Sequence, residues 1–141
     1  VRAFRARSLG PGTYQVPNNV SFADQGGDVK FMFNSELRFK IVSILHGATF
    51  VDAGNIWLRK EDSRPGTEFK LKNTFNELAV GTGVGLRVDA SIFVVRVDGA
   101  FPIRKPYLPD GKRWVLNEVD FGSKTWRRDN LVINIGIGYP F

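Results

Sequence analysis

The chain has 141 residues, a length suited to one domain, and its 20 Lys and Arg against 14 Asp and Glu give a net charge of +6. It has no cysteine, which excludes disulfide frameworks, thiolate catalysis and cysteine metal sites. The one histidine, His46, stands in "ILHGA", a setting more typical of a turn than of a metal ligand or general base. We therefore expect no enzymatic activity, no cofactor and no metal site.

The positive charge first suggests a nucleic-acid partner. The basic residues, however, form no helix face and no block, and those between residues 104 and 128 are mixed with acids in a stretch that contains glycine and proline. Solvated loops that face a polyanionic surface fit this pattern as well as DNA does, and we expect no nucleic-acid partner. A nucleic-acid-binding β-protein stays an alternative, which predicts salt-dependent DNA binding and solubility without detergent.

Residues 1–28 contain turn signals in succession, which predicts an irregular segment: "LGPG", "VPNN" and "DQGGD". The next stretch, "KFMFNSELRFKI", alternates strictly between apolar and mostly polar side chains, which predicts a strand over 29–42. Its twelve residues, at ~3.3 Å each, span roughly 40 Å, or about 30 Å when tilted by ~40°. That length matches the hydrocarbon core of a bilayer, whereas a typical soluble strand has about 5–6 residues.

Similar alternation predicts four more strands, over 48–58, 78–89, 92–102 and 131–141. Short turns join the first strand to the second and the third to the fourth, whereas the segments 59–77 and 103–130 are long. Short turns on one side and long outer loops on the other are typical of outer-membrane barrels. Within the first loop, "EFKLKNTFNEL" fits a helical turn and an irregular segment equally well.

The alternation by itself fits a soluble barrel with an apolar interior as well as a membrane barrel with an apolar exterior. Two features favour the membrane barrel. The polar faces of the predicted strands would make a poor core, because they carry small or charged residues: Gly81, Gly83, Gly85, Arg87, Arg96 and Glu36. Aromatic residues also stand near strand ends, where an aromatic girdle is expected: Trp57, Phe101, Tyr139 and Phe141.

The predicted fold class is all-β, with five strands that form the C-terminal part of a transmembrane antiparallel β-barrel. Five strands cannot close such a barrel, because about eight is the usual minimum. Free edges would leave backbone groups unpaired in lipid at a cost of about several kcal/mol each. We therefore expect the strands 29–42 and 131–141 to pair with strands from an N-terminal portion or from another chain.

Three motifs lie at suitable distances: "VRAF" at the start, "FVDAG" over 50–54, and "NIGIGYPF" at the end. Together they make the chain resemble the BamA/TamA superfamily of outer-membrane assembly barrels, the bacterial surface antigen family. The resemblance covers the whole chain and implies that residues 1–28 form a loop folded into the barrel lumen. It implies that Arg2 binds Glu36 and Asp52, with Val1 and Phe4 completing the loop motif.

The last strand carries the residues that the resemblance identifies as the C-terminal assembly signal: Asn134, Gly136, Tyr139 and Phe141. The family motif has glycine where this chain has Ala3, which favours a sub-branch similar to TamA. Arg5 and Arg7 have no assigned partner. Two roles fit them: lining of the lumen, or pairing with Asp89 or Asp98.

The residue types on the polar faces of the predicted strands are consistent with a loop held inside the barrel. Glu36 and Asp52 share the polar face of adjacent predicted strands, and two confined carboxylates need a cation, which the planar fork of an arginine can supply. Gly81 and its alternate glycines leave room for a loop on that face. A static ion pair and a lock that opens during a functional cycle both fit this pattern.

The resemblance implies a bacterial outer-membrane protein that inserts, folds or translocates other outer-membrane proteins through a lateral seam. Its expected partners are client outer-membrane proteins, outer-membrane lipid and lipopolysaccharide. A two-partner-type secretion pore is one alternative, and a passive outer-membrane barrel is another. Gly136 and Gly138 fit two interpretations. Either they loosen the side-chain packing of the last strand at the seam, or they only leave space in the lumen.

Overall fold

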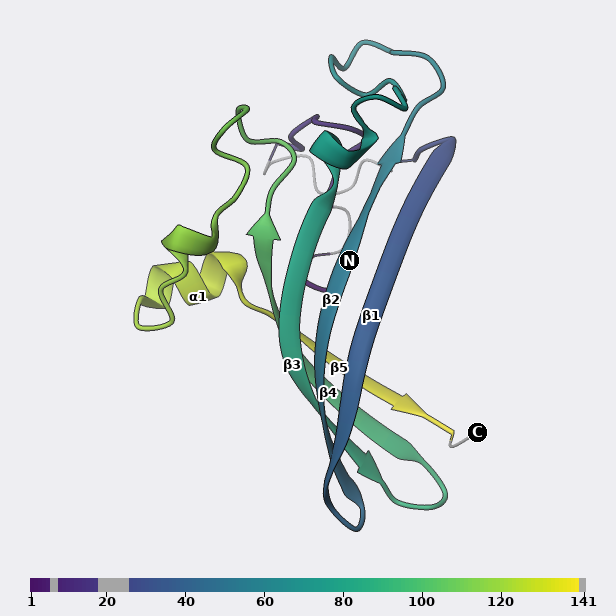
Figure 1. Cartoon of the computed structure of the whole chain (residues 1–141), viewed down its shortest axis with the longest axis vertical. Helices are drawn as coiled ribbons and strands as arrows, with labels where there is room; N and C mark the ends of the chain where they lie inside the picture. Colours follow the sequence, from purple (N-terminus) through teal and green to yellow (C-terminus); the bar gives the residue numbers. More distant parts are fainter. Residues whose placement is uncertain (6–7, 18–25, 140–141) are drawn as a thin grey trace.

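The computed structural model describes residues 1–5, 8–17 and 26–139. Five antiparallel strands form one open sheet, and each strand pairs with its neighbours in the chain (Figure 1). In order these strands are β1 (Val29–Val42), β2 (Leu45–Trp57), β3 (Ala79–Asp89), β4 (Val94–Arg104) and β5 (Val132–Gly138). The all-β fold with five antiparallel strands is thus confirmed, and the open sheet has the order of a partial up-and-down barrel.

The helical elements are short and lie in the two long connections. They are the 3₁₀ helices η1 (Thr74–Glu77) and η2 (Leu116–Glu118) and the α-helix α1 (Lys124–Asn130). The long connections gather at one end of the sheet and the two short turns at the other (Figure 1). In the described part of the chain, no helix is long and apolar enough to cross a membrane.

The bounds of β1 agree with the prediction, whereas those of the other four strands differ from it by a few residues. β2 begins at Leu45 rather than at 48, because the turn after β1 takes only residues 43–44. β4 is shifted by two residues along the chain, since it covers Val94–Arg104 instead of 92–102. β5 is shorter than the predicted 131–141, since its pairing with β4 runs only from Val132 to Gly138.

The two faces of the sheet have opposite character. Leu37, Val84 and Ile135 project from one face with 70%, 64% and 71% of their surface exposed. The other face carries Asp52 and Asp98, both fully buried. A soluble barrel buries its apolar face, so this arrangement is that of a barrel whose exterior meets lipid and whose interior is polar.

The N-terminal segment covers the polar face. Ala3 packs against Phe50 of β2 and Ala100 of β4, and Val1 and Phe4 add partly buried contacts. These few apolar contacts hold the first residues of the chain against the middle of the sheet.

A second anchor fixes this segment near the long-loop end. The buried amide of Asn55 donates to the carbonyl of Gly12 at 2.8 Å and to that of Glu77 at 2.6 Å. The Gly12 N–H donates to the Ile56 carbonyl at 2.8 Å. Gly12 has φ +60°, and a side chain there would overlap the Gly66 carbonyl, so this close approach requires glycine.

The structure corrects the predicted place of one aromatic residue. Trp57 is fully buried instead of lying in a girdle at the membrane surface. The outer loop covers it, because Phe69 packs edge-on at 5.6 Å and the indole N–H donates to Glu77 at 2.6 Å. Periodicity places Trp57 at a strand end but carries no information on how the loop folds over that end.

Candidate functional site

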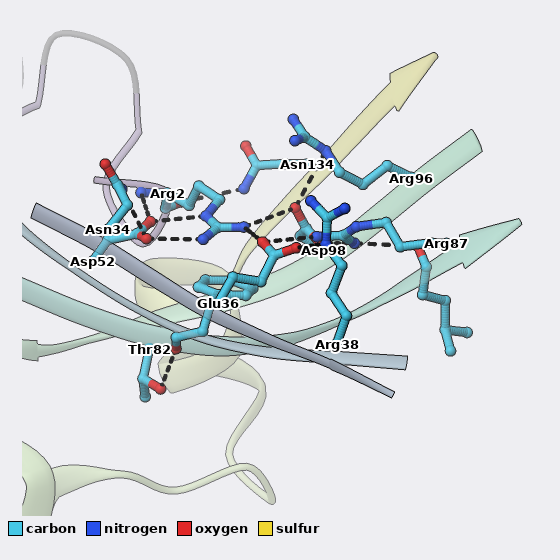
Figure 2. A network of polar contacts seen from close by, with 12 residues as sticks. Arg2, Asn34, Glu36, Arg38, Asp52, Thr82, Arg87, Arg96, Asp98 and Asn134 are labelled. Carbon is cyan, nitrogen blue, oxygen red and sulfur yellow. Dashed lines mark hydrogen bonds and ion pairs between the residues drawn. The ribbon is translucent and has the colours of Figure 1, made fainter. Parts of the chain in front are cut away.

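The polar face of the sheet is organised around Arg2. Its Nε and Nη2 donate to the two oxygens of Asp52 at 2.8 and 2.9 Å, and its backbone N–H donates to Oδ2 at 3.0 Å. Its Nη1 donates to Oε2 of Glu36 at 2.7 Å (Figure 2). Hydrogen bonds to Asp52 raise the pKa of Arg2 above its ordinary value. The fork therefore holds one carboxylate in bidentate fashion and a second one with its remaining nitrogen.

The strand register explains why both carboxylates reach one arginine. Asn34 lies opposite Asp52, and Glu36 lies opposite Phe50, so the two acids stand diagonally on one face of the β1–β2 pair. Asn34 donates its side-chain amide to Oδ1 of Asp52 at 2.9 Å. The Phe50 ring lies under the guanidinium carbon of Arg2 at 3.5 Å, a cation–π contact.

A second arginine, Arg87 of β3, enters the same network. Its Nη2 donates to Oε2 of Glu36 at 3.1 Å, the oxygen that Arg2 also contacts, and its Nη1 donates to Oδ1 of Asp98. Arg2 Nη1 lies 3.6 Å from Oδ2 of Asp98. Sequence reasoning placed Arg87 on the polar face but did not assign it a role. The alternation of side chains along the strand was the available signal for the face on which Arg87 lies. Its pairing with Asp98 depends on the β3–β4 register.

The network extends across all five strands, as Figure 2 shows. Arg38 donates its Nε to Glu36 at 2.6 Å, and the Nε of Arg96 lies 3.5 Å from Oδ2 of Asp98. Asn134 of β5 donates its side-chain amide to the carbonyl of Arg2 at 3.2 Å. The first residues of the chain are thereby tied to the last strand as well as to the first two.

The charged groups of this network come partly from the strands and partly from the N-terminal loop. The strands contribute three arginines and three carboxylates: Arg38, Arg87, Arg96, Glu36, Asp52 and Asp98. Arg2 is the fourth cation. Within the described residues, Glu36 and Asp98 each have strand arginines beside them, whereas Arg2 is the one cation paired with Asp52. Asp52 is therefore the carboxylate that depends on the loop.

The remaining residues of the predicted site are distributed as follows. Val1 and Phe4 pack on the small core below Arg2. Gly136 lies beside Arg96, since a Cβ there would be 3.4 Å from the arginine Nε. Tyr139 is 75% exposed, and Phe141 lies outside the described residues.

The other two N-terminal arginines differ from Arg2. Arg5 donates to the backbone carbonyl of Arg128, at the end of the second long connection, rather than to Asp89 or Asp98. Arg7 lies outside the described residues. The described residues also contain no group of three or more His, Asp or Glu side chains placed to hold a metal ion.

Fold and site together define a segment of an outer-membrane barrel whose polar interior holds its own N-terminal loop. The model of the Omp85 superfamily domain matches residues 1–141, and the chain belongs to this superfamily. Its members are outer-membrane proteins, in a family involved in the insertion or secretion of proteins at that membrane. Searches of curated proteins and of solved structures found no match.

Proposed function

We propose that the chain belongs to a bacterial outer-membrane protein that inserts, folds or translocates other outer-membrane proteins through a lateral seam. It acts without chemical catalysis, through strand pairing and loop movement. The observation that carries the proposal is the contact set of Arg2, which joins the loop to Asp52 and Glu36 on the first two strands. A passive barrel has no need for such a closely fitted attachment.

The charge balance supports a lock that opens rather than a permanent anchor. If the loop withdraws, Glu36 keeps Arg38 and Arg87, and Asp98 keeps Arg87 and Arg96. Asp52 alone loses its cation and retains Asn34. Loop release thus has one main electrostatic cost, which a client segment or a shift of β2 could offset.

The properties of the last strand support a seam that can open. β5 has 7 residues against 14 in β1, and Gly136 and Gly138 interrupt its polar face. Fewer paired residues and fewer packed side chains lower the energy needed to separate an edge strand from a neighbour. A client strand can then pair with the exposed edge by β-augmentation.

A disulfide that seals the seam tests this function. Ile135→Cys would be combined, in the complete membrane-inserted protein, with a cysteine placed opposite it on the strand that closes the barrel. The matched control joins Ile135→Cys to Val97→Cys, because these residues are already paired within β4–β5. We expect the seam disulfide to abolish client assembly in proteoliposomes, and reduction to restore it. Full activity with a sealed seam would contradict the proposal.

The branch and partners are part of the same proposal. Outer-membrane lipid and lipopolysaccharide surround the apolar face, client outer-membrane proteins use the seam, and the VRAF motif with Ala3 favours a TamA-like branch. The alternative is a two-partner-type secretion pore, which the superfamily also accommodates. Protease protection separates the two activities, because an inserted client stays in the bilayer whereas a secreted one is released on the far side.

A further inference from the structure

The concave polar face widens into a cavity of about 560 Å³ between the arginine–carboxylate network and the two short turns. All five strands contribute to its wall. Its charged and polar lining includes Arg38 of β1, His46 of β2, Arg87 and Asp89 of β3, and Arg96 of β4. Gly136, Ile137 and Gly138 of β5, with Tyr139 beyond them, form the side next to the open edge of the sheet.

The lining is strongly basic. Three arginines stand against one carboxylate, Asp89, which already accepts from the Ser91 N–H at 3.1 Å. Arg38 donates its Nε to Glu36, and the contact of Arg96 with Asp98, at 3.5 Å, is also through Nε. Within the described residues their terminal Nη groups have no acceptor, and their side chains are 68% and 48% exposed. Each arginine therefore offers unused donors to an incoming anion.

A buried donor beside the cavity also has no hydrogen-bond partner. Arg87 is 5% exposed, and its Nε is one of two buried side-chain polar atoms without a hydrogen-bond partner among the described residues. The other, Oδ2 of Asp98, has Arg96 and Arg2 within 3.5 and 3.6 Å. Because this nitrogen is buried, it adds positive charge behind the wall and is not a donor that a ligand in the cavity can reach.

Gly136 lies next to Arg96 in the cavity wall. A Cβ at this position would be 3.4 Å from Nε and 3.5 Å from Nη2 of Arg96. These are ordinary contact distances, so the guanidinium lies close to the backbone of β5, the strand at the open edge of the sheet. The cation is thus positioned where a strand that joins that edge would pass.

We propose that this cavity binds carboxylate side chains of an acidic polypeptide segment, in extended conformation, as it enters along β5. The inference rests on the proposed function, because the segment is part of a client. Planar guanidinium forks suit carboxylates, and the cavity volume exceeds what a single small anion needs. Lipid is the less suitable occupant, since the cavity lies on the polar concave face and not on the apolar face.

The test measures binding of labelled peptides to the complete protein in detergent micelles by fluorescence anisotropy. One ten-residue peptide alternates Asp with Ser, and its matched partner alternates Asn with Ser. We expect the Asp peptide to bind and the Asn peptide not to bind. The double variant Arg38→Gln/Arg96→Gln should weaken binding by about tenfold or more, as expected for lost charge-assisted bonds. Arg59→Gln, on the outer loop, should leave it unchanged.

Three outcomes would overturn the proposal: equal binding of both peptides, full affinity of the double variant, or displacement of the peptide by an equal concentration of inorganic phosphate. Folding of each variant is checked by its heat-dependent gel mobility. Client assembly is measured on the same samples. Lost peptide binding with normal assembly would reject the cavity as a client site while the proposed function stands, and failed assembly by the unmodified protein would reject the function itself.

Discussion

At the scale of single residues, Arg2 is defined by the geometry of its partners. It engages both oxygens of a fully buried carboxylate and one oxygen of a second, over an aromatic ring. An ammonium group is a point donor and cannot reproduce that fork. A buried carboxylate that loses its partner is strongly destabilising, at about 3–5 kcal/mol.

We therefore predict that Arg2→Ala, and less severely Arg2→Lys, will expose the N-terminal loop to protease. Arg5→Ala is the control from the same loop, because the side chain of Arg5 donates to a backbone carbonyl of the outer connection and, among the described residues, holds no buried carboxylate. Cleavage rates in the complete protein measure the effect. Equal protection of Arg2→Ala and wild type would show that the loop is held by its apolar contacts instead.

A second prediction concerns the contact between Ala3 and Gly81. A Cβ added at Gly81 would overlap the Cβ of Ala3, whereas the Ala3 Cα lies at 3.5 Å, an ordinary contact. Gly81→Ala alone should thus push the loop away and increase its cleavage. The exchange Ala3→Gly/Gly81→Ala removes the overlap and should restore protection. A double variant as sensitive as Gly81→Ala would contradict a direct contact between these two residues.

At the scale of elements, each strand combines a lipid-facing and a lumen-facing row. β1 shows this best, because Leu37 projects outward and Glu36 and Arg38 belong to the interior network. Side chains alternate across a strand, so neighbouring residues in the chain experience opposite environments.

This alternation predicts unequal effects of one substitution on the two faces. Leu37→Arg should lower the free energy of unfolding in bilayers by about 2–4 kcal/mol, because it places a charge near the middle of the lipid-facing row. Met32→Arg introduces the same residue on the polar face and should have a smaller effect. Urea titrations of the complete protein in vesicles give both values, and equal effects would argue against the assignment of the faces.

At the scale of the whole molecule, the open sheet is the dominant feature. β1 pairs only with β2, and β5 only with β4, in the described part of the chain. Each free edge presents backbone donors and acceptors that water satisfies but lipid does not. We therefore expect further strands to pair with these two edges when the apolar face lies in a membrane.

The segment by itself should accordingly fail to form a closed barrel. We expect residues 1–141, refolded in detergent, to show no heat-dependent change of gel mobility and to associate through the β1 and β5 edges. Adding the remaining barrel strands should restore the mobility shift and reduce association. A stable monomer with a mobility shift would mean that the segment closes on itself.

Periodicity in the sequence determined the strand faces, because side-chain alternation is a local property with a period of two residues. It placed Glu36 and Asp52 on one interior face, and the VRAF motif, through a family resemblance, identified Arg2 as their partner. The strand faces are encoded by neighbouring residues, whereas the role of Arg2 came from the resemblance and not from a local pattern.

Only the tertiary structure decided which partners meet across strands. The β1–β2 register sets Asn34 opposite Asp52, and the β3–β4 pair brings Arg87 to Asp98. The burial of Trp57 and the position of α1 depend on how long connections fold back, which no short-range pattern specifies. Register and loop packing are contacts between distant parts of the chain, so they follow from the energy of the whole sheet and not from any one segment.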